Sequence, residues 1–302
     1  MSRLKAQILV RLRRAVTTTI TTLIVAISLG NLSRIESAIA QTPVNQFSSP
    51  DLTDPVDITP LESRLCPSNL EATIAAIIKG PRFNTAQWGI LIEPVSEPTV
   101  LYKYNSDTSL IPASNIKLLT TAAALRIIGD RTPRNRLSLE DWVTVINRDS
   151  DNDLADALLR QIGGQRAVRS ALAVLGVNSN SYEQVDGSGL SRKNRAKPST
   201  FVTLLREMHT HDESGLFYHS LSIAGVNGTL RNRFRDTPVQ GRVHAKTGTL
   251  QGVRALSGYL ENADYGTIAF SIVVNQPGQS AQVMTQAVDQ IVLQTAQVTR
   301  CN

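Results

Sequence analysis

Cysteine, histidine and clustered positive charge are scarce in this chain, and each scarcity excludes a class of site. The 302 residues contain two cysteines and four histidines, the latter at positions 209, 211, 219 and 244. These histidines show no metal-ligand spacing with cysteines or carboxylates. We therefore predict no metal site and no cofactor.

The first 40 residues have the pattern of an export signal. Five basic residues lie within the first 14 positions, an apolar run covers 15–29, and Ala38 and Ala40 form a cleavage site of small residues. The run is about 15 residues and includes six Thr and Ser, whereas roughly 20 apolar residues are needed to span a bilayer. We expect a signal peptide cleaved after residue 40, with an uncleaved membrane anchor as the alternative.

Most of the positive charge belongs to that signal. Residues 1–40 carry six Arg and Lys against one acid, Glu36, which is +5 of the formal net charge of +6. The remaining chain is near +1, and its basic residues form no cluster with interleaved aromatic side chains. We therefore predict no nucleic-acid partner.

The rest of the chain divides into a tether and a folded domain. From residue 41 to 67 the chain is polar and is interrupted by five prolines, so we expect an extended tether over 41–66. Residues 67–302 are numerous enough for one large core or for two lobes that share an interface. No internal repeat is visible in this domain.

Apolar periodicity gives the expected order of elements. It predicts a helix over 68–78 with Ser68 as a cap, strands over 88–94 and 99–105, helices over 115–129, 138–147, 153–162, 165–175 and 199–210, strands over 241–250, 254–260 and 267–275, and a last helix over 279–297. The predicted fold class is α/β (α+β), with an antiparallel five-stranded sheet flanked by helices. A mostly helical lobe, about 114–240, would be inserted after the second strand, and a site would form between lobe and sheet.

Ser114 and Lys117 form a Ser-x-x-Lys pattern at the start of the helix over 115–129. The spacing of three places both side chains on one helix face, so that the lysine nitrogen can reach the serine hydroxyl. Alone the pattern is weak, because Ser114 could merely cap the helix and Lys117 could be solvated.

Two further short patterns follow in the chain. Ser150, Asp151 and Asn152 precede a helix, where such residues also serve as N-caps. Lys246, Thr247 and Gly248 lie on a predicted strand, where a lysine could also guard a sheet edge.

Together and in this order, the three patterns are the motif set of serine β-lactamases and penicillin-binding proteins. Three stretches, "DGSGLSRKN" (186–194), "LSIAGVNGTLRNRF" (221–234) and "AKTGTLQGV" (245–253), together with "SDNDLADALLRQIG" (150–163), closely resemble one family within that set. This is the D-alanyl-D-alanine carboxypeptidase/endopeptidase family, the S13 peptidases or class C low-molecular-mass penicillin-binding proteins. The resemblance covers about residues 67–300.

The resemblance implies a serine-type D-Ala-D-Ala carboxypeptidase located in the periplasm or cell envelope of a bacterium, and it leaves open whether the enzyme is also an endopeptidase. Its partners would be peptidoglycan stem peptides ending in D-Ala-D-Ala, with β-lactam antibiotics as inhibitors.

The implied catalytic residues are Ser114 as nucleophile, Lys117 as base and Ser150 as proton relay. The implied substrate-binding residues are Asn152, Lys246, Thr247, Gly248 and Thr249. Lys246 would present a cation to the substrate carboxylate, its charge would favour the neutral form of Lys117, and Gly248 would keep the strand bare for the substrate. The backbone N–H groups of Ser114 and Thr249 would form the oxyanion hole.

One departure from the family is large. Its members commonly carry two extra domains between the first two motifs, whereas only 32 residues separate Lys117 from Ser150 here. Two alternatives stay open: a serine β-lactamase, although no clear Glu-x-x-x-Asn loop lies between Asn152 and Lys246, and a non-catalytic penicillin-sensing or cell-wall-binding protein.

The two cysteines lie at the ends of the predicted domain. In the fold that the family implies, the first and last helices pack antiparallel on one sheet face, which brings Cys66 and Cys301 together. Because exported proteins keep disulfides, we expect a bridge between them, with two unpaired thiols as the alternative.

Overall fold

The computed structural model of the chain describes residues 65–129, 138–212 and 215–301. The predicted signal peptide and all but the last residues of the predicted tether lie outside the described residues. The elements are α2 (Pro67–Ile78), β1 (Gln87–Pro94), β2 (Tyr102–Tyr104), α3 (Lys117–Ile128), α4 (Leu139–Thr144), α5 (Asn152–Gln161), α6 (Gly164–Val174), β3 (Tyr182–Glu183), β4 (Arg195–Ala196), α7 (Pro198–His211), α8 (Leu216–His219), β5 (Ser222–Ile223), β6 (Val243–Leu250), β7 (Val253–Asn262), β8 (Gly266–Asn275) and α9 (Ala281–Ala296).

The main sheet is antiparallel and joins the two ends of the domain. Its strand order is β2-β1-β8-β7-β6-β5, so that the early strand β1 pairs with the last strand β8 over eight residue pairs. The predicted fold class and the five predicted strands are confirmed. The main sheet has one strand more than expected, the short strand β5. It pairs with β6 through only two residues, too few to produce an alternating pattern in the sequence.

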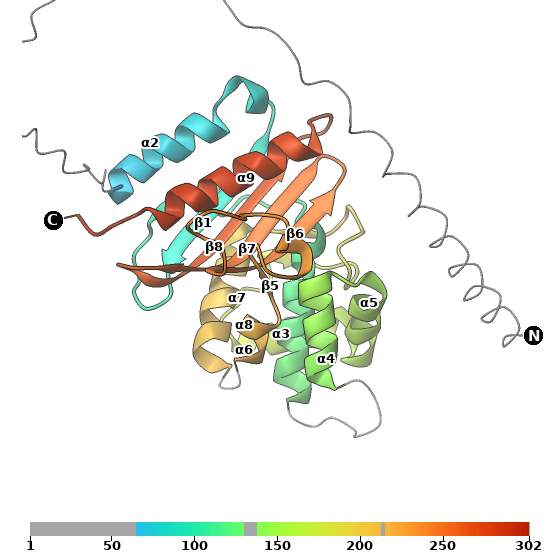
Figure 1. Cartoon of the computed structure of the whole chain (residues 1–302). Coiled ribbons are helices and arrows are strands. Elements are labelled where there is room, and N and C mark those ends of the chain that lie inside the picture. The colour runs from blue at the N-terminus through green and yellow to red at the C-terminus, as the bar shows by residue number, and fades with distance from the viewer. Residues whose placement is uncertain (1–64, 130–137, 213–214, 302) are drawn as a thin grey trace, which may run out of the picture. The chain divides into compact units, whose positions relative to one another are not determined.

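Helices cover both faces of the sheet (Figure 1). Helices α2 and α9 pack on one face, and the helical block from α3 to α8 lies on the other. One apolar core is shared by the sheet with α2 and α9, and a second by the sheet with the helical block. Strands β7 and β8 are therefore buried almost throughout, as expected where both faces of a sheet are covered.

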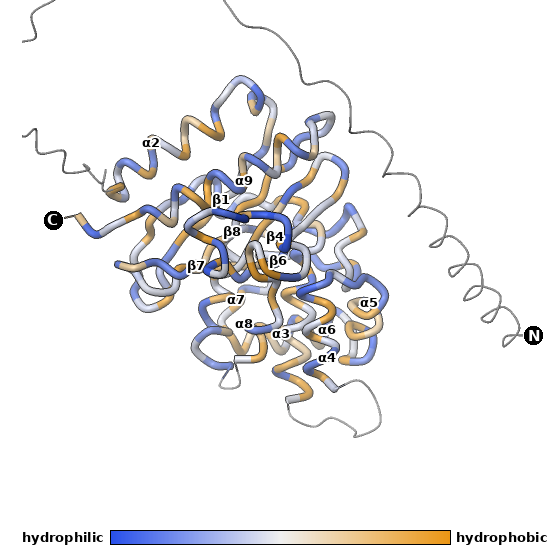
Figure 2. The backbone as a smooth tube through the Cα atoms, in the orientation of Figure 1, coloured by the Kyte–Doolittle hydropathy of each residue, from blue (hydrophilic) through white to orange (hydrophobic). Residues whose placement is uncertain are grey.

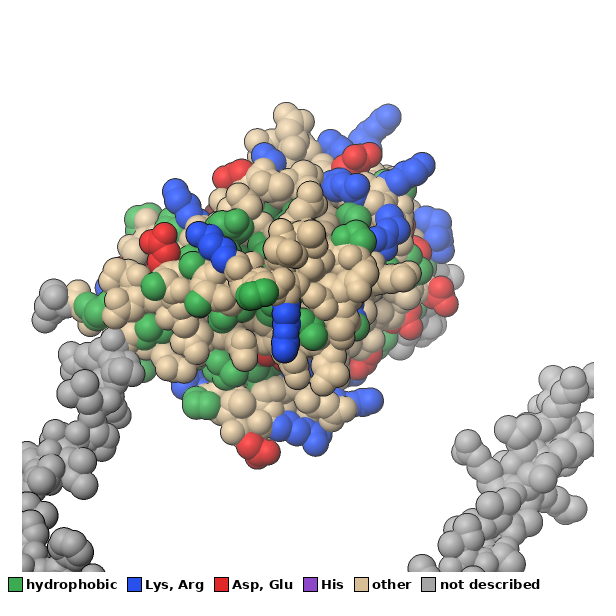
Figure 3. All heavy atoms as spheres, turned by 90° about the horizontal axis from the view of Figure 1, so that it is seen from above, with side chains coloured by type: hydrophobic (Ala, Val, Ile, Leu, Met, Phe, Trp, Pro, Cys, Tyr) green, Lys and Arg blue, Asp and Glu red, His purple; other side chains and the backbone are tan. Residues whose placement is uncertain are grey.

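Most helices are amphipathic, and their polar sides remain at the surface, whereas α3 is buried on all sides from Lys117 to Ala124. Apolar and polar residues alternate along the helical segments in Figure 2, the pattern of elements with one buried face. On the face seen in Figure 3, apolar side chains occur singly or in small groups among basic, acidic and uncharged ones, as on ordinary globular surfaces. None of the helices in the described part of the chain combines the length and apolar character needed to cross a bilayer.

The predicted cap of the first helix is wrong. Helix α2 begins at Pro67, and Cys66 occupies the N-cap position without a capping side-chain hydrogen bond. Proline suits the first helical position because its fixed backbone angle is already helical and its missing N–H would have no partner there. Ser68 therefore lies inside the helix.

A disulfide closes the folded domain. Cys66 and Cys301 are bonded, with Cα atoms 5.6 Å apart and 235 positions between them in the chain. Nearby, the backbone N–H of Thr299 donates to the carbonyl of Leu65 at 3.0 Å. Because α2 and α9 pack against each other, the start of one and the end of the other meet, as expected from the family resemblance.

Candidate active site

The Ser-x-x-Lys pair lies where a 3-10 turn, Ala113–Ile116, continues into α3. The Lys117 ammonium nitrogen donates to Ser114 Oγ at 3.0 Å. Ser114 caps neither the turn nor α3, and Lys117 is fully buried, so neither residue has the structural role that was its alternative. The serine is partly exposed and the lysine approaches it from inside the protein.

The turn that carries the nucleophile candidate is strained. Ala113, directly before Ser114, has φ of 49° and is fully buried. A left-handed backbone at a residue with a Cβ costs about 1 kcal/mol or more, and persists only where the surroundings enforce it. The turn also places Ser114 among the first residues of a helical segment, whose N–H groups have no acceptor within the helix.

The Ser-Asp-Asn pattern supplies one direct contact to Lys117. Asp151 caps α5 by accepting from the Leu154 N–H at 2.8 Å, so the capping interpretation holds for that residue. Asn152 is the first residue of α5, and its Oδ1 accepts from Lys117 Nζ at 2.8 Å. Ser150 has φ of 64°, is partly exposed and has no side-chain hydrogen bond within the described structure. The structure thus joins Ser114, Lys117 and Asn152 directly and, within the described residues, shows no side-chain hydrogen bond between Ser150 and any of them.

Lys246 lies on β6 and is also fully buried. Its Nζ donates to the backbone carbonyl of Thr247 at 3.1 Å. Burial lowers the pKa of Lys246 well below its usual value, and the positive charge of Lys117 lowers it further. A substrate carboxylate beside it would favour the charged form again.

The open edge of β6 faces the site. The Val243 carbonyl accepts from the Ala224 N–H at 2.9 Å on the β5 side, while β5 pairs only with the start of β6. Because backbone groups alternate between the two sides of a strand, those of Thr247 and Thr249 point to the same edge, where no strand pairs with them, although the Thr247 carbonyl already accepts from Lys246 Nζ. Thr249 is exposed there, whereas the Thr247 hydroxyl donates to Thr229 Oγ1 at 2.9 Å.

The structure gives a different reason for Gly248 than the one expected. A Cβ at this position would lie 2.5 Å from the Pro112 carbonyl oxygen and 2.9 Å from the Ala255 Cβ. Glycine is therefore needed because β6 packs tightly under the turn that carries Ser114, and its predicted role in leaving room for a substrate stays a prediction. The missing side chain sets the distance between the strand and the nucleophile.

The pKa of Lys117 is lowered to about 8 by its burial. The carboxylates of Asp156, Asp186 and Asp151 oppose this shift. Burial is the largest cause of this lowered pKa. Repulsion between the two ammonium groups, the cause expected from the sequence, lowers the pKa of Lys246, and because the repulsion is mutual it disfavours the charge of Lys117 as well.

Sequence reasoning missed the loop that completes this site. Lys117 Nζ makes a short hydrogen bond to the backbone carbonyl of Ser188, and Ser114 Oγ donates to the same carbonyl at 3.3 Å. Ser188 lies in the "DGSG" stretch, which supported the family resemblance without receiving a role. Asp156, which holds this loop, lies four residues after Asn152 on α5, a helical spacing that could have flagged it.

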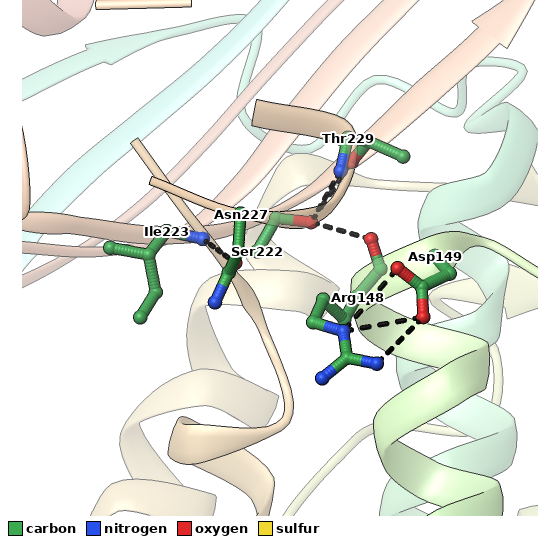
Figure 4. A network of polar contacts seen from close by, with 6 residues as sticks. All are labelled: Arg148, Asp149, Ser222, Ile223, Asn227 and Thr229. Carbon is green, nitrogen blue, oxygen red and sulfur yellow. Dashed lines mark hydrogen bonds and ion pairs between the residues drawn. The ribbon is translucent and has the colours of Figure 1, made fainter. Parts of the chain in front are cut away.

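A second network connects the strand of Lys246 with the loop of Ser150 (Figure 4). The Ser222 hydroxyl donates to the Arg148 carbonyl at 2.8 Å and lies 3.0 Å from Thr229 Oγ1. Gly228 is required beside it, because a Cβ there would lie 2.5 Å from the Arg148 carbonyl oxygen. Since Thr229 also accepts from Thr247, the chain of hydroxyl groups reaches from β6 to the residues before Ser150.

The arrangement is suited to nucleophilic catalysis by serine. A partly exposed hydroxyl lies within hydrogen-bond distance of a lysine whose pKa burial brings to about 8. At neutral pH about a tenth of such a lysine is deprotonated and able to accept a proton. Among the residues that the structure describes, no group of three histidines, cysteines or carboxylates could hold a metal ion.

The chain is similar to proteins of known structure and function. It is 39% identical over 153 residues to the D-alanyl-D-alanine carboxypeptidase of Actinomadura sp., a match that covers 45% of this chain and 28% of that protein. Its fold matches penicillin binding protein 4 from Haemophilus influenzae with a TM-score of 0.67 and 14% identity, over 74% of this chain and 99% of the other. The TLA-3 extended-spectrum β-lactamase matches with a TM-score of 0.63 and 16% identity, over 76% and 97% of the two chains.

These matches differ in what they establish. Both structural matches show the fold shared by penicillin-binding proteins and serine β-lactamases. In sequence, the chain spans less than a third of the length of the first curated relatives that it matches. The D-Ala-D-Ala carboxypeptidase 3 (S13) family matches residues 70–133 and 136–298, which include every motif of the site, and the chain therefore belongs to that family.

Proposed function

We propose that this protein is a serine-type D-Ala-D-Ala carboxypeptidase that acts through a covalent acyl-enzyme. The observation that carries the proposal is the contact of 3.0 Å between Ser114 Oγ and the buried amine of Lys117, in a chain of the S13 family. A serine hydroxyl is inert near neutrality without a base, and a buried lysine with a lowered pKa is such a base.

In the acylation step, Ser114 Oγ attacks the carbonyl carbon of the penultimate D-Ala. Neutral Lys117 takes the hydroxyl proton as the C–O bond forms. The tetrahedral oxyanion is stabilised by the backbone N–H groups of Ser114 and Thr249, each of which would contribute about 3 kcal/mol. When the C–N bond breaks, the leaving amine takes a proton through the Ser150 hydroxyl, and the terminal D-Ala departs.

In the deacylation step, water attacks the ester carbonyl and loses a proton to Lys117. The C–O bond to Ser114 then breaks, and the proton returns to Ser114 Oγ. The products are a shortened peptide carboxylate and the free enzyme, so that one water is consumed for each D-Ala released.

Substrate recognition would use groups that remain available in the site. Lys246 would pair with the C-terminal carboxylate of the substrate, which restores the positive charge that burial disfavours. Asn152 uses Oδ1 for Lys117, so that its Nδ2 is the group that would donate to a substrate carbonyl. The unpaired edge of β6 at Thr247 to Thr249 would add backbone hydrogen bonds to an extended peptide.

The substrates would be peptidoglycan stem peptides that end in D-Ala-D-Ala, and cross-links between them if the enzyme is also an endopeptidase. β-Lactams would acylate Ser114 as inhibitors. Such substrates lie outside the bacterial cytoplasm, so we infer export to the periplasm or cell envelope, which agrees with the basic and apolar pattern of residues 1–40 and with a disulfide in the folded domain.

Two alternatives are less well supported. A serine β-lactamase has the same fold, but within the described residues no glutamate contacts Ser114 or Lys117 as a second base for fast deacylation. A non-catalytic penicillin sensor would not need a base beside the serine, and here the lysine is held at 3.0 Å.

The deciding experiment incubates the purified protein with a peptide ending in D-Ala-D-Ala and measures free D-Ala. Release by the wild-type chain, lost in folded Ser114→Ala, is expected. Release of D-Ala that persists in Ser114→Ala would overturn the proposal. Rapid turnover of penicillin without D-Ala release would favour the β-lactamase, and stable acylation without turnover of either substrate would favour the sensor.

A further inference from the structure

Lys117 has three hydrogen-bond acceptors around one nitrogen. They are Ser114 Oγ, Asn152 Oδ1 and the Ser188 carbonyl. A charged ammonium donates to all three, whereas a neutral amine has two N–H bonds and one lone pair. Because the Asn152 and Ser188 oxygens can only accept, they take the two N–H bonds, and the lone pair of the neutral amine then points to the Ser114 hydroxyl.

The position of the Ser188 carbonyl depends on Asp156. Asp156 Oδ1 accepts from the backbone N–H groups of Gly187 at 2.7 Å and Ser188 at 2.9 Å. The same loop is closed on itself by Asp186, which accepts from Gly189 and Ser191 N–H groups, each at 2.7 Å. One carboxylate shapes the turn, and the other attaches it to α5.

Close packing leaves the loop no other position. A Cβ at Gly187 would lie 2.4 Å from the Ala155 carbonyl oxygen, and one at Gly189 would lie 2.1 Å from the Ala113 carbonyl oxygen. The two glycines therefore fit the loop between α5 and the turn that carries Ser114. Ser188 is 1% exposed, so its carbonyl is shielded from water and available to Lys117.

We propose that Asp156 is a positioning residue of the acylation step: it fixes the 186–189 turn so that the Ser188 carbonyl, together with Asn152, aims the amine of Lys117 at Ser114. Nothing in the three motifs of the family assigns this role. The inference rests on the proposed function, since it concerns the base of that reaction.

Asp156 acts by geometry and by charge, and two variants separate these effects. Asp156→Ala removes the acceptor of both backbone N–H groups, so the turn and its carbonyl lose their anchor. Asp156→Asn keeps an oxygen in the same place but removes a negative charge. The charged groups around Lys117 are Asp156 in α5, Asp151 at the N-cap of α5, Asp186 in the loop and Lys246 on β6.

The test measures the second-order rate of Ser114 acylation by a fluorescent penicillin between pH 6 and 10, in the wild type and both variants. Asp153→Asn, on the exposed side of α5, is the matched control. We expect Asp156→Ala to acylate at least tenfold more slowly than the control with an unchanged circular dichroism spectrum. Asp156→Asn should keep its plateau rate within about threefold, while its acidic limb moves to lower pH, because losing the carboxylate lowers the pKa of Lys117.

The proposal is overturned if Asp156→Asn and Asp156→Ala both acylate like Asp153→Asn at every pH. If Asp156→Ala does not fold, Asp156→Ser, whose short side chain cannot reach both backbone N–H groups, takes its place, because Asp156→Asn reports only the effect of the charge. NMR titration of ε-¹³C-labelled lysine, with the Lys117 signal assigned from Lys117→Ala, gives the same answer without turnover. If the wild type neither acylates nor releases D-Ala, the proposed function fails, whereas an unmoved Lys117 titration in Asp156→Asn contradicts only the role of Asp156.

Discussion

At the scale of single residues, two opposed effects set the charge of Lys117. Burial disfavours its charge, while three aspartates and three acceptor oxygens favour it. Burial has the larger effect and lowers the pKa to about 8. Without the groups that favour the charge, the pKa would be lower still. The proposed base is therefore partly neutral at physiological pH instead of fully charged.

This balance predicts a rise in the acylation rate with pH. Below its pKa, Lys117 is protonated and cannot accept the Ser114 proton, so the rate should climb through an apparent pKa near 8. At pH 6 the rate should be about 100-fold below the plateau, since each unit below the pKa costs a factor of ten. Stopped-flow measurement with a fluorescent penicillin checks this, and a rate that is flat from pH 6 to 9 would exclude Lys117 as the base.

Lys246→Ala should separate carboxylate binding from other roles. On a D-Ala-D-Ala peptide, the variant lacks the buried partner of the substrate carboxylate. This should weaken transition-state stabilisation by about 2 kcal/mol or more, which lowers kcat/KM roughly 30-fold. On the same peptide with an amidated C-terminus the loss should be small. Equal losses on both substrates would mean that Lys246 acts on Lys117 instead.

Gly248→Ala tests the tight contact under the Ser114 turn. The added methyl group meets the Pro112 carbonyl and Ala255, so it should lower the free energy of unfolding by about 1–3 kcal/mol and slow acylation. Gly80→Ala is the control, since a Cβ there has only ordinary contacts of 3.4 Å. Chemical denaturation of both variants gives the comparison, and equal stability of the two would refute this explanation of the glycine.

At the scale of elements, the site is assembled from separate segments that hydrogen bonds and close packing align. The turn before α3, the start of α3, the start of α5, the 186–189 turn and β6 each contribute one group. The periodicity of the sequence located most of these elements within one to three residues of their bounds, because each buries one apolar face. It could not reveal β5 or the 186–189 turn, whose stability comes from contacts with other segments.

The hydroxyl network between β6 and the loop of Ser150 should matter for acylation. Thr229→Val keeps the shape but removes the hydroxyl that accepts from Thr247 and contacts Ser222. We expect the activation free energy of acylation to rise by about 0.5–1.5 kcal/mol, which slows acylation up to roughly tenfold. Thr210→Val, whose hydroxyl bonds only within α7, serves as the control. If the two variants acylate equally fast, the network has no part in aligning the site.

At the scale of the whole molecule, the disulfide joins the two ends of the domain on the sheet face opposite to the helical block. Titration of denatured, unreduced protein should find no free thiol. In the double variant Cys66→Ser, Cys301→Ser, we expect a loss of about 2–4 kcal/mol in unfolding free energy, below the roughly 5 kcal/mol that loop closure alone would give. The acylation rate should be unchanged, and a variant as stable as the wild type would show that the bridge has no stabilising role.

The sequence by itself determined the order of the elements, the fold class, the three motifs and the pairing of the two cysteines. All of these depend on local periodicity, on short spacings or on the resemblance of whole stretches to one family. Ser114 and Lys117 are three residues apart, so a helix alone brings them together.

Only the tertiary structure decided which other groups reach Lys117. Asn152 and Ser188 are 35 and 71 positions away from it in the chain. Asp156, which holds Ser188, lies 32 positions before Ser188. It also decided that Gly248 packs under the Ser114 turn and that burial is the main cause of the lowered pKa of Lys117. Separations of this length carry no information about distance until the sheet and both helical layers have packed, because the burial that sets both the contacts and the pKa exists only in the folded protein.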